Sequence, residues 1–176
     1  PRSSATRAAT ASSAGGQGPA AAEAASARRA RMLYSRRMTR AARLQLLSLY
    51  ENIELVERVL NEMCRSERVG EETCYWVGMA VREALANAIK HGNKLSAEKR
   101  VLVEVTLDPA EALEIVVEDE GEGFDPAGVA DPTDPGNLMR SSGRGVFYMR
   151  QFMDEVDFSL AERGGTRLRL RKNLNA

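Results

Sequence analysis

The sequence is poor in the residues that build disulfide scaffolds, zinc sites and membrane spans. Its 176 residues include two cysteines, Cys64 and Cys74, and one histidine, His91. Two cysteines cannot form a disulfide framework, and with one histidine they cannot supply the ligands of an ordinary zinc site. No apolar run approaches the roughly 18–20 residues of a membrane-spanning helix. We therefore expect a reduced, cytoplasmic protein without a membrane anchor.

Apolar side chains and acidic residues are scarce near the N-terminus. Residues 1–30 contain no Leu, Ile, Val or aromatic residue, so they are predicted to be disordered. Residues 1–43 hold nine arginines and one glutamate, a net charge of +8, whereas 44–176 carry 16 basic and 24 acidic residues, a net charge of −8. We predict a basic tail over 1–43 and a domain over 44–176 whose acidity argues against direct nucleic-acid binding. The tail's Arg, Ser and Ala bias also resembles an organellar transit peptide, although a solvated tail is the simpler interpretation.

Hydrophobic periodicity in the domain predicts both helices and strands. Helical spacing occurs over about 51–65, 71–91 and 145–153, and strand patterns occur near 44–49, 101–107, 113–117, 155–160 and 166–172. This order favours an α+β fold, a two-layer α/β sandwich in which helices cover one face of a mostly antiparallel mixed sheet. The Gly-, Pro- and Asp-rich stretch 119–145 is long enough to predict a functional loop.

Three polar patches could carry chemistry. Glu83, Asn87 and His91 are spaced at i, i+4 and i+8, so they would share one face of the second helix. Such a row is commonly only a solvated stripe. Its functional interpretation is that the Asn87 oxygen ligates Mg²⁺ while the Glu83 carboxylate orients or deprotonates a hydroxyl or water.

The other two patches are rich in glycine. Asp119-Glu-Gly121-Glu-Gly123 follows the strand 113–117, where glycines let the backbone approach a flat ligand and a carboxylate can accept from an amine. Gly143-Arg-Gly145 precedes a helix, whose first N–H groups suit phosphate. Taken separately, the first could be an acidic turn and the second an ordinary entry into a helix.

Together, the motifs resemble the GHKL ATP-binding superfamily, and most of all the bacterial anti-sigma-factor serine/threonine kinases. The strings that carry the resemblance are EALANAIKHG, DEGEGFDP, GRGVFYMRQFMDEVDF and GGTRLRLRK, which occur in this order between residues 83 and 172. The resemblance extends over 44–172 and implies the histidine-kinase-like Bergerat fold, with ATP and Mg²⁺ as the bound cofactors.

Site residues follow from the resemblance position by position. It implies that Glu83 is the catalytic carboxylate, Asn87 the metal ligand and Asp119 the acceptor for the adenine amino group. The other residues expected to bind the nucleotide are Lys90, His91, Gly121, Gly123, Arg140, Ser142, Gly143, Arg144, Gly145, Val146 and Thr166. Residues 125–142 would form a lid. Ser141 departs from the pattern, because these kinases carry there an arginine that holds the terminal phosphate, and only Arg140 or Arg144 could replace it.

The implied function is that of a kinase that phosphorylates a small antagonist (anti-anti-sigma) protein and sequesters a sigma factor, acting as a homodimer. One alternative is a nucleotide-gated interaction module with little phosphotransfer, which the displaced arginine favours. Another is the ATPase domain of a histidine kinase, but the residues before 44 lack the expected paired helices and acceptor histidine. Outside the motifs, Trp76 is predicted to fill the core, and Cys64 and Cys74 to be buried, unreactive thiols.

Overall fold

A computed structural model describes residues 39–123 and 144–175. The predicted tail up to residue 38 and the whole predicted lid, with Arg140 and Ser142, therefore lie outside the described residues. So does the predicted phosphate-binding Gly143. In the described ranges, no helix is long and apolar enough to cross a membrane.

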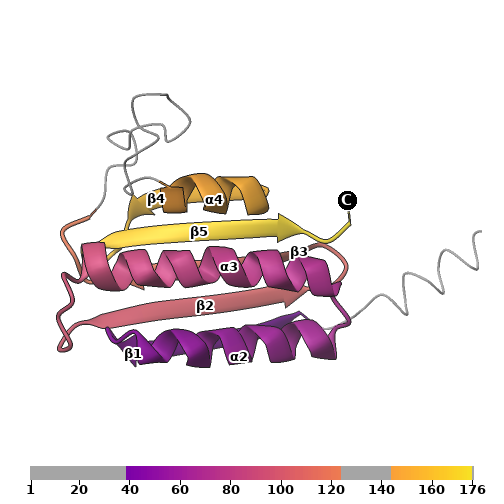
Figure 1. Cartoon of the computed structure of the whole chain (residues 1–176), viewed down its shortest axis with the longest axis horizontal. Coiled ribbons are helices and arrows are strands. Elements are labelled where there is room, and N and C mark those ends of the chain that lie inside the picture. The colour runs from indigo at the N-terminus through magenta and orange to yellow at the C-terminus, as the bar shows by residue number, and fades with distance from the viewer. Residues whose placement is uncertain (1–38, 124–143, 176) are drawn as a thin grey trace, which may run out of the picture. The chain divides into compact units, whose positions relative to one another are not determined.

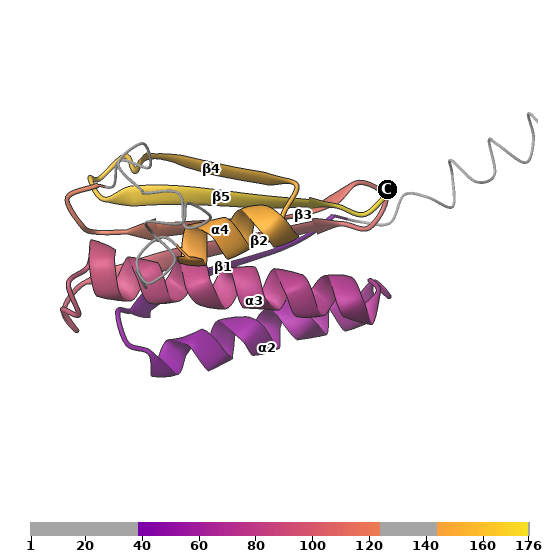
Figure 2. The same cartoon turned by 45° about the horizontal axis from the view of Figure 1, so that its top comes forward.

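The domain has two layers, a five-stranded sheet and a set of helices on one of its faces (Figures 1 and 2). The strands are β1 (Arg40–Leu47), β2 (Arg100–Asp108), β3 (Ala112–Asp119), β4 (Glu155–Leu160) and β5 (Thr166–Asn173). They lie in the order β1-β2-β3-β5-β4, and every neighbouring pair is antiparallel. The helices are α2 (Glu51–Ser66), α3 (Glu71–Asn87) and α4 (Arg144–Phe152). The α+β sandwich is confirmed, with a described sheet that is antiparallel rather than mixed.

The core lies between the sheet and the helices. Alternate residues of β2 and β3 point toward the helices, because side chains alternate across a strand. The buried set includes Val103, Val105, Ile115 and Val117 from the sheet and Val56, Leu60, Val77 and Val81 from the helices. Each such side chain stabilises the fold by roughly 1.5–3 kcal/mol relative to an exposed one.

Strand β1 begins at Arg40, four residues before the predicted start of the domain at Leu44. Residues 40–43 therefore belong to the sheet, and their assignment to the tail was wrong. Pairing with β2 extends from Arg40 opposite Leu107 to Leu47 opposite Arg100. The predicted strand near 44–49 is present, but its first half was missed because that half is basic rather than apolar. Arg43 in this half pairs with Glu104 of β2 at 3.1 Å.

The second predicted helix, 71–91, ends differently from the prediction. Its last turn, η1 (Ala88–Gly92), is a π-helix. The fully buried Asn93 follows it, and its backbone N–H donates to the carbonyl of Ala88 at 2.7 Å. The wider turn offsets His91 from the line through Glu83 and Asn87, because a π turn bonds residue i to i+5 instead of i+4.

Asn93 joins the end of this helix to two strands. Its side-chain Nδ2 donates to the carbonyl of Arg100 at 2.9 Å, and its Oδ1 accepts from the N–H of Glu120 at 2.8 Å. The chain entering β2 and the chain leaving β3 are thus bonded to one buried amide. Buried amides are stable only when they are paired. Asn93 therefore holds the end of the sheet where β2 begins and β3 ends against the helix.

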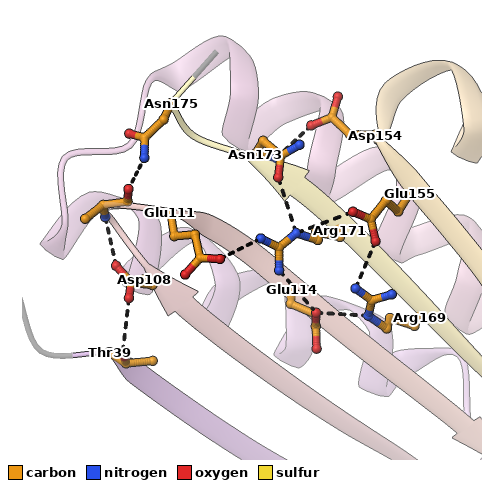
Figure 3. Close-up of polar contacts among 11 residues, drawn as sticks. Thr39, Asp108, Glu111, Glu114, Asp154, Glu155, Arg169, Arg171, Asn173 and Asn175 are labelled. Atoms are coloured by element: carbon orange, nitrogen blue, oxygen red, sulfur yellow. Dashed lines mark hydrogen bonds and ion pairs between the residues drawn. The ribbon is translucent and has the colours of Figure 1, made fainter.

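The other face of the sheet carries paired charges instead of helices. Figure 3 shows Arg169 and Arg171 of β5 between Glu114 of β3 and Glu155 of β4. Arg169 lies 3.0 Å from Glu114 and 2.9 Å from Glu155. The hydrogen bond to Glu114 is the main reason why the pKa of Arg169 is raised. Exposed ion pairs contribute only about 0–1 kcal/mol each, so the apolar face provides most of the stability.

We predict that Asn93→Ala lowers the free energy of unfolding by roughly 2–3 kcal/mol, because it leaves two backbone groups without their partner. Urea unfolding followed by circular dichroism measures the change. The matched control is Asn61→Ala, at an exposed position of α2, which should change stability by no more than about 0.5 kcal/mol. An equal effect of the two substitutions would contradict the bridging role of Asn93.

Candidate functional site

Glu83 and Asn87 lie one turn apart on α3 and contact each other. The Nδ2 of Asn87 donates to Oε1 of Glu83 at 3.2 Å, and both side chains are half-buried. This bond orients the amide, because an Asn that donates through nitrogen has its carbonyl oxygen available in another direction. The pair therefore offers an oriented carboxylate and an amide oxygen side by side.

The first turn of α4 lies directly against this carboxylate. A Cβ atom added at Gly145 would come within 3.0 Å of three side-chain atoms of Glu83. Glycine at this position thus leaves room for Glu83 beside the start of the helix. The first N–H groups of a helix are unpaired within it and favour anions, so a phosphate bound there would lie next to Glu83.

Asp119 ends β3 on the helix-covered face and is 6% exposed. Its Oδ1 accepts from the N–H of Gly121 at 2.8 Å and from the N–H of Thr166 at 3.0 Å. Both hydrogen bonds that the structure describes to this carboxylate reach Oδ1. They hold the carboxylate in one orientation, in which Oδ2 can accept a bond from a ligand.

Three glycines allow the backbone to approach Asp119 closely. An added Cβ at Gly92 or Gly165 would come within 3.0 Å of atoms of Asp119, and one at Gly121 within 3.0 Å of both Asp119 and Gly92. Gly165 also has a φ of +85°, a conformation that favours glycine. Any larger residue at these positions would fill the space around the carboxylate.

The structure therefore brings the predicted residues together in two groups. Glu83, Asn87 and Gly145 form one, and Asp119, Gly121 and Thr166 form the other. Thr166 takes part through its backbone N–H. The α3–η1 helix connects the groups, because it carries Glu83 and Asn87 and ends at Gly92, beside Asp119.

The remaining predicted residues are less closely placed. Lys90 and His91 are exposed on η1. Gly123 has a φ of +93° and adjoins Leu160, while Val146 packs against the core. Arg144 begins α4, but its side chain is outside what the structure describes.

Trp76 was predicted to fill the core, and this prediction was wrong. The indole is 36% exposed and stacks on Phe152 of α4, with ring centroids 4.4 Å apart. Sequence reasoning also did not foresee the role of Asn93, whose side chain bonds to Arg100 and Glu120.

The two cysteines agree with the prediction of unreactive thiols. Cys64 is buried and Cys74 half-buried, and burial raises the pKa of both thiols. A thiol with a raised pKa forms little of the reactive thiolate at neutral pH.

The donor atoms at the site suit Mg²⁺ held mainly by phosphates. In the ranges 39–123 and 144–175, no group of three or more His, Cys, Asp or Glu side chains could hold a metal ion. Mg²⁺ commonly uses one or two protein oxygens together with substrate phosphates. The oriented amide oxygen of Asn87, next to Glu83, is a fitting ligand of this kind.

Comparisons with known proteins agree with this geometry. The model of the histidine kinase-like ATPase domain matches residues 46–172. The chain is 37% identical over 97 residues to the anti-sigma F factor of Priestia megaterium, a match that covers 53% of this chain and 65% of that protein. It is also 37% identical over 98 residues to the anti-sigma F factor of Bacillus subtilis, covering 54% and 66%. These matches thus span just under two thirds of either relative.

A solved structure shares the fold at low sequence identity. It is titled the SiaB-SiaC complex from Pseudomonas aeruginosa; the TM-score is 0.57 at 16% identity, over 86% of this chain and 99% of the other. The sheet order, the glycine-lined Asp119 and the match over 46–172 lead to one conclusion: the chain belongs to the histidine kinase-like ATPase domain family, with the GHKL-type fold.

Proposed function

We propose that the protein is a Mg²⁺- and ATP-dependent serine/threonine protein kinase of the anti-sigma type. The observation that carries the proposal is the contact of Glu83 with both Asn87 and the first turn of α4. A carboxylate at this position is suited to accept the proton of a hydroxyl that attacks a phosphate bound at the helix start.

Each group of residues has a separate task. Asp119 accepts a hydrogen bond from the adenine amino group, and the glycines around it let the base approach. The N–H groups at the start of α4 bind the phosphates. Asn87 orients Glu83 and would hold the metal ion through its amide oxygen, while Glu83 takes the proton from the acceptor hydroxyl. When bound, Mg²⁺ neutralises charge on the transferring phosphoryl group.

The relatives support the choice of partner. Because they are named anti-sigma F factors, we propose that this protein binds a sigma factor, a small anti-anti-sigma antagonist that it phosphorylates, or both. A cytoplasmic homodimer is part of the same proposal. The alternative is a nucleotide-gated interaction module, favoured by Ser141 where the resembling kinases carry an arginine.

We predict that Asp119→Asn lowers ATP affinity roughly tenfold or more, because a charged hydrogen bond contributes about 1.5–3 kcal/mol. The new amide keeps the oxygen that accepts from Gly121 and Thr166 but presents an N–H to the adenine amino group. Calorimetric titration of ATP and GTP measures the effect, and GTP affinity should not fall in parallel. An equal loss for both nucleotides would argue against adenine recognition.

The substitution Asn87→Ala is expected to abolish the Mg²⁺-dependent part of ATP binding, because it removes the amide oxygen. Titrations of ATP with Mg²⁺ and with EDTA measure this part directly. Asn61→Ala on α2 is the matched control and should retain the difference between the two conditions. If Asn87→Ala binds Mg·ATP as the wild type does, the proposed metal ligand is wrong.

Replacing Glu83 with Gln tests the phosphotransfer itself. Glu83→Gln retains an oxygen that can accept from Asn87, so ATP affinity should stay within about twofold, whereas phosphotransfer should fall at least a hundredfold with loss of the base. Transfer of labelled phosphate from ATP to a serine-containing protein or peptide measures the rate. Wild-type transfer by Glu83→Gln would show that Glu83 is not the base, and ATP binding without transfer by the wild-type protein would favour the interaction module.

A further inference from the structure

An exposed aromatic cluster lies on α3 and α4, outside the nucleotide site. It consists of Tyr75, Trp76, Met79, Tyr148 and Phe152. Tyr75 is 60% exposed, Tyr148 51% and Met79 42%. The rings contact one another: Tyr75 meets Trp76 edge to face at 4.9 Å, and Phe152 stacks on Trp76 at 4.4 Å and on Tyr148 at 6.1 Å. The cluster is ordered by its own contacts but remains open to solvent.

This cluster is continuous with the catalytic pair. Trp76, Met79 and Glu83 are spaced at i, i+3 and i+7, so they follow one face of α3. On α4, Gly145 adjoins Glu83, and Phe152, seven residues later, meets Trp76. The two helices therefore run antiparallel, and Figures 1 and 2 show them side by side on the same face of the sheet. At a rise of 1.5 Å per residue, Trp76 lies about 10 Å from Glu83 along the helix.

The size of the cluster indicates the kind of contact that it can make. With aromatic side chains of 150–250 Å², the exposed fractions leave roughly 400 Å² of mainly apolar surface. A stable dimer buries about 800 Å² per partner, so this area is too small for a permanent interface between two copies. It suits a partner that binds, reacts at Glu83 and leaves.

We propose that the aromatic cluster is the docking surface for the protein that accepts the phosphate, and that it selects acceptors with a large apolar side chain about 10 Å from the reactive hydroxyl. In an extended segment this separation corresponds to about three residues. The inference rests on the proposed kinase function, which it deepens by describing the class of acceptor.

The test uses a set of synthetic peptides that contain alanine, lysine and one central serine. In each peptide a single leucine occupies a different position, so that the set covers all positions on both sides of the serine. Transfer of labelled phosphate from ATP is measured for each peptide. With the wild-type protein, leucine about three residues from serine should increase transfer roughly tenfold over alanine, since burying such a side chain contributes about 1.5–3 kcal/mol.

Trp76→Ala should lose this preference while binding ATP as tightly as the wild type. Tyr148→Ala is the second variant, and Leu55→Ala, which shortens an exposed leucine on α2, is the matched control and should retain the preference. The docking surface is refuted if the wild type phosphorylates the peptides without a leucine preference, or if Trp76→Ala keeps that preference. It is also refuted if analytical ultracentrifugation shows that Trp76→Ala dissociates a dimer, because a second copy would then cover the cluster.

A failure of the kinase function can be distinguished from a failure of the docking surface. If the wild type binds ATP but phosphorylates no peptide, the kinase function fails, and binding of the same peptides is then followed by the fluorescence of Trp76, the single tryptophan of the chain. A blue shift with leucine peptides that Tyr148→Ala abolishes would support docking without transfer. No shift with any peptide would overturn the docking surface as well.

Discussion

The candidate nucleotide pocket depends on how closely the backbone can approach the carboxylate of Asp119. Gly92, Gly121 and Gly165 come from three separate segments, and a side chain at any of them would overlap Asp119 or its neighbours. The N–H groups of Gly121 and Thr166 fix the same carboxylate. One buried acidic group thus sets the positions of the end of α3–η1, the end of β3 and the start of β5.

Helix α3 serves the core and the site at once. Val77, Val81 and Ala84 face the sheet, while Trp76 and Glu83 lie on another stripe of the same helix. The π turn after Asn87 then brings Gly92 next to Asp119. The side chain of Asn93 bonds the end of this turn to the start of β2 and to the residue after β3. Because one rigid helix carries all of these groups, the distance from the proposed docking surface to the carboxylate of Glu83 is set by helix geometry.

The strongest predictions from sequence were those based on local periodicity. The alternation of Val101, Val103 and Val105 and the spacing of Val56 and Leu60 lead directly to the observed strands and helices, because each pattern matches the repeat of its element. The start of β1 was missed because Arg40 and Arg43 lie on a strand whose pairing partner, β2, is some sixty residues away. Trp76 was misplaced because periodicity predicts which residues share a face but not whether another helix covers that face.

The resemblance of the ordered motifs to the GHKL superfamily led to the prediction that Glu83, Asn87, Asp119 and Gly145 belong to one site. The contacts that make them a site join segments far apart in the chain: Gly145 meets Glu83 across two helices, and Thr166 donates to Asp119 across two strands. Such contacts depend on how the elements pack, and the packing results from the burial of all apolar side chains together. For that reason the candidate site residues could be proposed from the chain, whereas the π turn, the buried Asn93 and the solvent-exposed aromatic cluster emerged only from the folded domain.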